Sequence, residues 1–333
     1  VLRNMRADGK AIVIITHKLQ EVLSLSDRVT ILRKGQYIDT VDTKDATEMM
    51  LTEMMVGKKI SLDIEHPEPV NCEKRLEIRD LTVMNKYGVP AIDHVSFDAY
   101  SGEILGIAGI AGSGQKELLE AIAGLQDTER GSVLYTAPGG TEPTELIGKN
   151  AQNIRDLGVA LSFVPEDRLG MGLVGSMGVA GNMMLRSYRR GNSLLADRKT
   201  PRILAEEIIE ELDVAVPDVD TSVKKLSGGN VQKILVGREI AANPTVLMMA
   251  YAVRGLDINT SYTIYHLLNE QKKRGTAVIY VGEDLDVLLE LCDRILVLCG
   301  GRVSGIVDTK TATKEEVGLL MTKLTEGGTG DGK

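Results

Sequence analysis

The stretch GIAGSGQK, residues 109–116, follows the apolar run 104–108 and precedes a helical pattern that extends to about residue 123. A buried strand that leads into a glycine-rich turn and a helix is the repeating unit of mostly parallel α/β sheets. Further apolar runs at 246–249 and 277–281 also precede helical patterns. The chain is therefore predicted to be an α/β protein with a largely parallel sheet.

The same stretch has the sequence context of a phosphate-binding loop (P-loop). Its glycines allow backbone N–H groups to converge on phosphate oxygens, and the N-terminus of the following helix adds positive potential. A standard P-loop continues with Lys and Ser or Thr, whereas this chain has Gln115 and Lys116. Lys116 should leave the helix roughly 100° away from the usual lysine. Taken alone, this loop has an alternative interpretation: a tight turn that only packs the helix on the strand and binds no phosphate. The candidate phosphate-binding residues are Gly109, Gly112, Ser113, Gly114, Gln115, Lys116 and Glu117.

A second candidate anion site lies in the run KLSGGNVQK, residues 225–233, which opens a predicted helix. Ser227 and the amides of Gly228 and Gly229 at a helix N-terminus would attract an anion. A flexible loop with an N-cap would explain these three residues alone. However, the run is followed by a buried strand and by Gly255-Leu256-Asp257, and this combination of signals is much rarer than the Ser-Gly-Gly run alone.

Together these motifs resemble those of the ATP-binding subunit of ABC transporters. On that resemblance LSGGN with Gln232 is the signature motif, and Asp257 belongs to the D-loop. Tyr87 stands where an adenine-stacking aromatic usually lies, and His17 is similar to the switch histidine. The resemblance implies a P-loop NTPase fold, an ABC-type nucleotide-binding domain with an antiparallel β subdomain and an inserted helical subdomain. It also implies ATP and Mg²⁺ as cofactors.

An internal repeat predicts the domain organisation. Residues 9–47 align without a gap with residues 275–313, which indicates a duplicated module. Because the first residues are neither a signal peptide nor a natural start, we expect an N-terminally truncated chain. The predicted parts are a C-terminal remnant of a first nucleotide-binding domain (1–64), a linker (65–75), a complete second domain (76–323) with its helical subdomain at about 165–240, and a disordered tail (324–333).

Within the first copy, residues 11–15 are predicted to be a buried strand, followed by a helix to Leu25 and a hairpin over 28–41. The sheet that this strand should join is not encoded in residues 1–60. Their apolar faces would therefore be exposed. We expect these residues to pack on the second domain, to swap between chains, or to come from a longer parent protein whose remainder is missing. The apolar residues concerned are Ile12, Ile14, Val22, Leu25 and Ile31.

Several positions that the resemblance assigns to catalysis carry other residues. The strand 246–249 should end in an Asp-Glu pair that binds Mg²⁺ and polarises water, but Ala250 and Tyr251 can do neither. The switch histidine is replaced by Glu283, and Glu166 or its neighbour occupies the region of the metal-sensing glutamine. We expect this nucleotide site to be degenerate and deficient in hydrolysis, with Mg²⁺ needed mainly at an intact site of the parent protein. No metal site is predicted in this chain.

In the ABC family, each ATP lies between the P-loop of one domain and the signature motif of another. The resemblance therefore implies that Ser227, Gly228 and Gly229 complete the site of the first domain, where His17 would also act. The required partner is a second nucleotide-binding domain, in the same chain or another. The P-loop sequence and PEDR at 165–168 narrow the resemblance to the bacterial importer ATPases for sugars and nucleosides.

The importer resemblance implies membrane permease subunits as partners and a peripheral place on the cytoplasmic face of the cell membrane. We expect the permease contact near 163–190, where Met171, Met177, Met183 and Met184 would give an adaptable surface. Ordinary helical core is the alternative for these methionines. A non-transport ABC ATPase is disfavoured because residues 114–227 contain no coiled-coil or basic insertion. A regulatory module that uses this fold without binding nucleotide is a further alternative function.

Composition limits the remaining possibilities. The net charge of −8 and the pI near 5.3 disfavour non-specific binding to nucleic acid, which needs a basic face, so no nucleic-acid partner is expected. Cys72, Cys292 and Cys299 have no metal-like spacing and indicate a reducing compartment. No apolar run approaches the roughly 18 residues of a membrane span.

Overall fold

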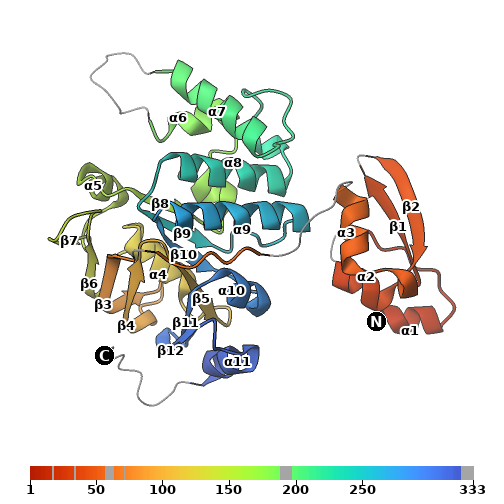
Figure 1. Cartoon of the computed structure of the whole chain (residues 1–333), viewed down its shortest axis with the longest axis horizontal. Coiled ribbons are helices and arrows are strands. Elements are labelled where there is room, and N and C mark those ends of the chain that lie inside the picture. The colour runs from red at the N-terminus through yellow and green to blue at the C-terminus, as the bar shows by residue number, and fades with distance from the viewer. Residues whose placement is uncertain (17–18, 34, 57–63, 71, 188–196, 324–333) are drawn as a thin grey trace. The chain divides into compact units, whose positions relative to one another are not determined.

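The computed structural model describes residues 1–16, 19–33, 35–56, 64–70, 72–187 and 197–323 of the 333-residue chain (Figure 1). Its contacts divide the chain into two compact units. The small unit comprises Val1–Asp63 with Gly255–Tyr262, and the large unit comprises Ile64–Arg254 with Thr263–Lys333. The predicted tail, 324–333, lies outside the described residues.

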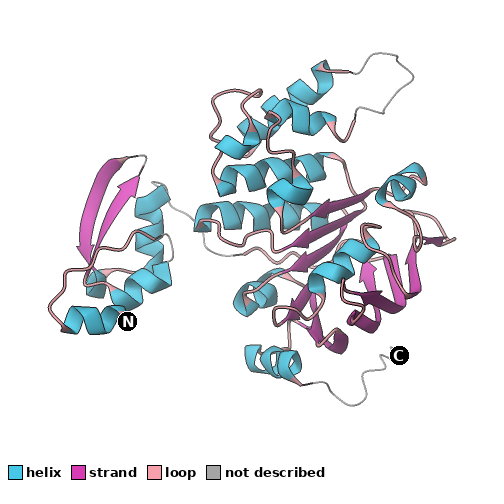
Figure 2. Ribbon diagram, turned by 180° about the vertical axis from the view of Figure 1, so that it is seen from behind, coloured by secondary structure: helices cyan, strands magenta, loops and turns pink. Residues whose placement is uncertain are grey.

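A six-stranded sheet forms the centre of the large unit. Five of its strands run parallel, and β12 joins the edge antiparallel. In sheet order the strands are β12 (Arg302–Asp308), β11 (Arg294–Cys299), β5 (Ile104–Gly109), β10 (Ala277–Val281), β9 (Val246–Ala250) and β8 (Leu161–Val164). Every residue of β9 and β10 is buried, as expected for parallel strands covered on both faces. Figure 2 shows helices on either side of these strands.

A separate antiparallel sheet packs into the same core. Its order is β4 (Pro90–Tyr100), β3 (Lys74–Met84), β6 (Arg130–Tyr135) and β7 (Thr144–Glu145). The helix α4 (Gln115–Ile122) contributes Leu118, Leu119 and Ile122, which are buried together with residues of both sheets. The resemblance implies an antiparallel β subdomain, and this sheet confirms it; the strands β6 and the two-residue β7 were not predicted from the sequence.

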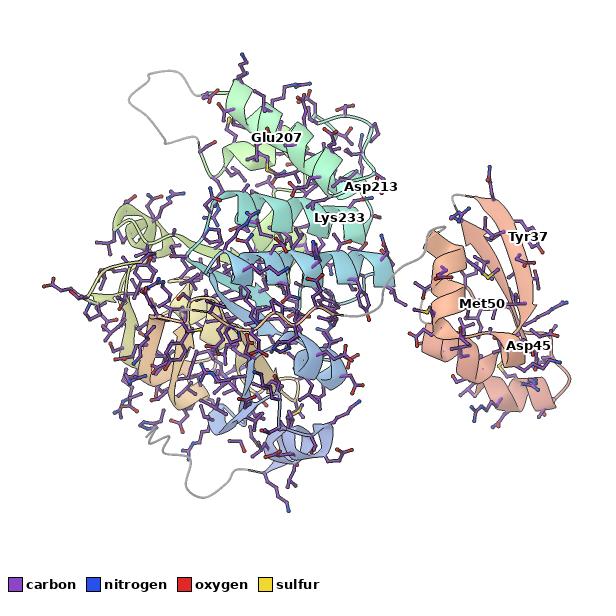
Figure 3. All side chains as sticks on the ribbon, viewed as in Figure 1. Tyr37, Asp45, Met50, Glu207, Asp213 and Lys233 are labelled. Atoms are coloured by element: carbon purple, nitrogen blue, oxygen red, sulfur yellow. The ribbon has the colours of Figure 1, made fainter. Side chains whose placement is uncertain are left out.

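Helices between β8 and β9 form a layer of their own, within the range predicted for the helical subdomain. They are the π-helical turn η2 (Arg168–Gly172), α6 (Val179–Met184), α7 (Lys199–Glu211), the 3-10 turn η3 (Val223–Lys225) and α8 (Gly228–Ala241). Figure 1 shows α6 and α7 beyond α8 as seen from the sheet. Gly237 permits the close packing of α7 on α8, since a Cβ there would lie 2.7 Å from Ile208 Cγ2. Lys233 also ties α8 to the end of α7 by donating to the Asp213 carbonyl oxygen at 3.1 Å (Figure 3).

The remaining helices of the large unit flank the sheets. They are α5 (Ala151–Asp156), α10 (Leu285–Leu291), α11 (Lys314–Thr322) and α9 (Ile258–Lys273), which belongs to the large unit from Thr263 onward. Among the described residues, no helix combines the length and the apolar composition that crossing a bilayer requires.

The small unit has a small core of its own around Leu19, Ile31 and Leu51. Its elements are α1 (Leu2–Ala7), α2 (Leu19–Leu25), β1 (Arg28–Arg33), β2 (Gln36–Asp42), the 3-10 turn η1 (Thr43–Asp45) and α3 (Glu48–Val56). Tyr37 on β2 lies outside this core and is exposed (Figure 3). Ile31 was expected to be exposed but is buried, because the hairpin packs on α3.

The predicted strand at 11–15 is wrong. These residues have no regular structure, and Val13 and Ile15 are 92% and 99% exposed. Strands gain their stability from neighbours, and no described strand pairs with this segment. Apolar side chains of this unit were expected to be exposed, and in the segment 11–15 they are, including Ile14.

The sequence repeat is also a repeat of structure. The elements α2, β1, β2 and α3 begin and end 266 residues before α10, β11, β12 and α11, respectively. The irregularity between Ile31 and Leu32 in the first hairpin recurs between Val297 and Leu298 in the second. The strand β10 has no counterpart, because its equivalent is the exposed segment 11–15.

The predicted linker packs on the large unit. The two ring nitrogens of His66 lie 2.9 Å from the Glu290 carbonyl oxygen and 3.0 Å from Asp293 Oδ1. Glu68 pairs with Lys310 at 2.6 Å, and Glu65 accepts a hydrogen bond from Asn269. Residues 64–70 therefore belong to the large unit.

Asp293 joins this linker to the central sheet. Its Oδ2 accepts the Ile104 N–H at 2.8 Å, at the first residue of β5. Its Oδ1 lies 2.7 Å from the ammonium of Lys272, whose side chain is 1% exposed. A buried ammonium without its partner is costly, so this carboxylate stabilises the start of β5 and the end of α9 together.

We predict that Asp293→Ala lowers the free energy of unfolding of the large unit by about 3–5 kcal/mol, because Lys272 would stay buried without a counter-charge. Urea denaturation followed by circular dichroism measures this change. Asp286→Ala is the matched control, since Asp286 pairs with Lys314 on the exposed surface, and it should have a much smaller effect. Equal destabilisation by the two substitutions would contradict the role of Asp293.

Candidate nucleotide site

Four parallel strands of the large unit end at one edge of the sheet. β5, β10, β9 and β8 are consecutive neighbours, with Ile107 paired to Val281, Val281 to Ala250, and Met249 to Val164. The loops that follow them contain the P-loop stretch, Glu283, Tyr251 and Glu166, respectively. Open α/β sheets bind their ligands at the carboxyl ends of the strands, so these loops form the candidate site.

The P-loop stretch has the backbone of a phosphate-binding turn. Gly112 and Gly114 have φ angles of +88° and +92°, and Gly114 is the N-cap of α4. A Cβ at Gly114 would lie 2.3 Å from the Ala91 carbonyl oxygen, whereas a Cβ at Gly112 would meet no atom within 4 Å. The first amides of α4 have no intrahelical acceptor. The loop therefore fits the phosphates of a nucleotide through its backbone.

The side chains of this loop supply no positive charge to its interior. Gln115 is 2% exposed, and its Nε2 donates to the Ile110 carbonyl oxygen at 3.2 Å. Lys116 lies on the outside of α4, with its ammonium 3.8 Å from Glu120 Oε1. Ser113 is buried, and Gly109 leaves room for the Gln115 amide. Phosphate binding here would depend on backbone amides and the helix terminus alone.

The position of the expected metal ligands is apolar and aromatic. Ala250 is buried, and Tyr251, with φ of +51°, donates its N–H to the Val281 carbonyl oxygen at 3.0 Å. Burial raises the pKa of Tyr251, and the carboxylates of Glu166 and Glu283 raise it further. Among the described residues, no group of three or more His, Cys, Asp or Glu could hold a metal ion. The residues at this edge do not fit Mg²⁺.

Arg254 ties the loops together. Its Nη1 lies 2.5 Å from Glu166 Oε1 and its Nε lies 3.1 Å from Glu283 Oε1. Its guanidinium is 5.7 Å from the centre of the Tyr251 ring, and its carbonyl oxygen accepts a hydrogen bond from Arg168 at 2.5 Å. Arg254 therefore forms salt bridges with residues that follow two different strands. Its place between two glutamates could not be read from spacing along the chain.

The LSGGN run starts α8. Ser227 is the N-cap and accepts the Asn230 N–H at 3.4 Å. Ser227 and Gly228 are exposed, and Gly229 is half-buried. Gln232, predicted as a nucleotide contact, is instead fully buried one turn further along the helix. The structure therefore brings Ser227 and the two glycines to the surface, but not Gln232.

The three remaining residues predicted to belong to nucleotide sites lie outside both the P-loop stretch and the LSGGN run. Tyr87 is in the turn between β3 and β4, is 77% exposed, and has the Lys86 ammonium 5.0 Å from its ring centre. The Asp257 carboxylate caps the start of α9 by accepting the Thr260 N–H at 3.0 Å. His17 lies outside the described residues.

A cavity of about 1070 Å³ lies between the sheet and the helical layer, near η2. Leu125, Phe163 and Met171 give it an apolar lining. Arg186 pairs with the buried Glu239 at its wall. Burial, with a smaller effect of Arg186, lowers the pKa of the adjacent Arg238 to about 10. Of the four methionines predicted to form a docking surface, Met171 lines the cavity, whereas Met183 is core.

Comparisons with known proteins identify this architecture. Residues 92–249 match the ABC transporter family. The large unit has the fold of an ABC ATP-binding cassette. The structure of an ATP-binding subunit of an ABC transporter superposes with a TM-score of 0.61 at 20% identity, over 75% of this chain and 100% of that one. A nucleotide-free ATP-binding cassette gives 0.59 at 21% identity, over 75% and 95% of the two chains. The predicted ABC-type fold is confirmed.

Curated relatives of this ABC domain are import proteins. The chain is 37% identical to the nucleoside import ATP-binding protein NupA of Lactococcus lactis subsp. cremoris, over 96% of this chain and 62% of that one. It is 35% identical to the guanosine import ATP-binding protein NupO of Bacillus subtilis (98% and 63%). It is 34% identical to the galactose/methyl galactoside import ATP-binding protein MglA of Escherichia coli (95% and 61%). The chain thus spans about 60% of the length of these relatives.

The P-loop geometry of the ABC domain predicts different effects at its two left-handed glycines. Gly112→Ala should cost only the backbone strain, about 1–2 kcal/mol. Gly114→Ala adds a steric overlap with the Ala91 carbonyl oxygen and should cost about 2–5 kcal/mol. Thermal unfolding of the two variants measures the difference. A Tm for Gly114→Ala equal to or above that of Gly112→Ala would show that the loop does not approach β4 this closely.

Proposed function

We propose that this chain is the energy-coupling ATP-binding component of an importer of sugars or nucleosides, and that its own nucleotide site does not hydrolyse ATP. The import relatives support the first part. The absence of hydrolysis is inferred from the residues at the carboxyl edge of the sheet. There Ala250 and Tyr251 stand in place of the expected acidic residues, and Arg254 pairs with Glu166 and Glu283. The position expected to hold the general base is occupied by Tyr251, and a neutral phenol cannot take a proton from water there.

The residues of this site would bind a nucleotide without hydrolysing it. ATP bound at an intact site of the parent protein would supply the phosphoanhydride bond whose hydrolysis drives transport. Backbone amides of the loop at 109–116 would hold its phosphates, and the exposed ring of Tyr87 would stack on its base. Loss of a general base alone costs roughly 10²–10⁴ in rate. The metal ligands and the P-loop lysine are replaced as well, so hydrolysis at this site should fall below useful turnover.

The signature motif would serve another ATP. Ser227 and Gly228 are exposed at the N-terminus of the 14-residue helix α8, where amides and the helix dipole favour an anion. We assign them to a site whose P-loop belongs to a second nucleotide-binding domain, together with His17 and the D-loop residue Asp257. The structural repeat supports this arrangement: residues 1–64 are proposed to be the C-terminal part of such a domain.

The permease would dock at the cavity between the sheet and the helical layer. Its lining joins apolar side chains to the charged group of Arg186, Arg238 and Glu239, so it can hold an amphipathic segment. The cavity also borders the loop after β8, which carries Glu166. Movement of a docked segment would thereby reach the nucleotide site. Such docking places the chain on the cytoplasmic face of the membrane.

We predict that the purified chain shows steady-state ATP turnover at least about 100-fold below 1 s⁻¹, a common scale for enzymes. A phosphate-release assay with ATP and Mg²⁺ measures it. Tyr251→Glu should not restore turnover, because the P-loop lysine is still replaced by Gln115 and Arg254 would neutralise a new carboxylate. Turnover near 1 s⁻¹ in the unchanged chain would refute the proposal of a non-hydrolysing site.

The docking proposal predicts that Leu125→Glu and Met171→Glu together reduce binding to the permease by about tenfold or more, since two charges would enter an apolar groove. Both side chains are about half exposed, so folding should be preserved. Co-purification from detergent-solubilised membranes measures binding. Leu319→Glu on the exposed face of α11 is the control and should bind normally. If the double variant also binds normally, the permease docks elsewhere.

A further inference from the structure

The strand register places a carboxylate beside the P-loop. Ile107 of β5 pairs with Val281 of β10. Gly109 and Glu283 each follow their partner by two residues, so they leave the sheet at the same level. Neighbouring strands lie about 4.8 Å apart. Glu283 therefore emerges next to the point where the phosphate chain of a nucleotide would extend beyond the loop.

Two further carboxylates face the same edge. Glu166 reaches Arg254 from the loop after β8, and Glu117 lies in the first turn of α4. Glu166 and Glu283 both contact Arg254, whose guanidinium lies 5.7 Å from the centre of the Tyr251 ring. Arg254 is the cation that pairs with Glu166 and Glu283. Arg168 contacts the Arg254 carbonyl oxygen and approaches Gly228, and Lys116 is turned toward Glu120.

A terminal phosphate would have to compete with two carboxylates for the guanidinium of Arg254. Its guanidinium already contacts Glu166 and Glu283, and its movement to a phosphate would leave both carboxylates without their cation. The site also does not fit Mg²⁺, which would otherwise offset the charge of a triphosphate. A third phosphate would therefore meet negative charge, whereas two phosphates would end at the loop amides.

We infer that the P-loop of this domain takes a nucleoside diphosphate in preference to a triphosphate, and that Mg²⁺ adds nothing to this binding. The inference rests on the proposed function, because it assigns the occupant of the non-hydrolysing site. The pocket would remain in one nucleotide state while the other site of the importer turns over.

Isothermal titration of the whole chain with ADP and with ATP, each in EDTA and in Mg²⁺, tests the inference. ADP should bind roughly tenfold more tightly than ATP, since like charges a few ångströms apart repel strongly at a partly buried site. Mg²⁺ should change either affinity by less than about twofold, in contrast to a site with hard oxygen ligands.

Two variants test the carboxylates separately. Glu283→Gln and Glu166→Gln should each raise the affinity for ATP several-fold and leave that for ADP nearly unchanged, because only the third phosphate reaches them. Glu283 is about half exposed, so the fold should tolerate the change. Glu315→Gln on α11 is the matched control and should leave the ratio of the two affinities unaltered.

The outcomes separate this inference from the proposed function. ATP binding as tight as ADP, or a requirement for Mg²⁺, without turnover would overturn the diphosphate preference alone. Binding of neither nucleotide would also overturn it and would favour a nucleotide-independent module, while the docking of the permease would still be tested by co-purification. Turnover near 1 s⁻¹ would instead refute the non-hydrolysing site itself.

Discussion

The parallel alignment of β5, β10, β9 and β8 is the constraint on which the candidate site depends. It brings residues from four distant segments to one edge of the sheet, at a level set by the register. The P-loop backbone, the Tyr251 turn, Glu283 and Glu166 meet there for this reason alone. Any residue that follows one of these strands is exposed to the charges that follow the others, so the replacements at this edge act on one another.

The sequence predicted the elements that depend on a local pattern of residues. Its predictions failed where the structure depends on a neighbour that is distant in the sequence. Buried runs such as 246–249 predicted strands, and the glycines around 109–116 predicted the loop. The run 11–15 has the same apolar pattern, yet it forms no strand, because no described strand lies beside it. Gln232 was expected at the site but faces the core, since the signature residues cover less than one turn of α8. The contacts of Arg254 join residues 88 and 29 positions away, beyond the reach of motif spacing.

The repeat shows how one residue changes its role with its surroundings. Asp27 and Asp293 occupy equivalent positions, and the backbone of each accepts the N–H of the equivalent threonine, Thr43 or Thr309. The Asp293 carboxylate is buried and binds the Ile104 N–H and Lys272. The Asp27 carboxylate is exposed and pairs with Arg6 on the surface. The turn is thus specified locally, whereas the buried ion pair requires a neighbouring strand.

The same reasoning relates the residues that occupy the positions expected to be catalytic. A glutamate at 283 would repel a carboxylate pair at 250 and 251, and all of these groups face one edge of the sheet. With Ala250 and Tyr251 in those places, Glu283 and Glu166 can share the guanidinium of Arg254. The arginine then satisfies the charges that a metal ion would otherwise hold, and its stacking near Tyr251 fixes its position. A carboxylate introduced at position 250 or 251 would compete with Glu166 and Glu283 for Arg254, so the residues at this edge form a single arrangement of charges.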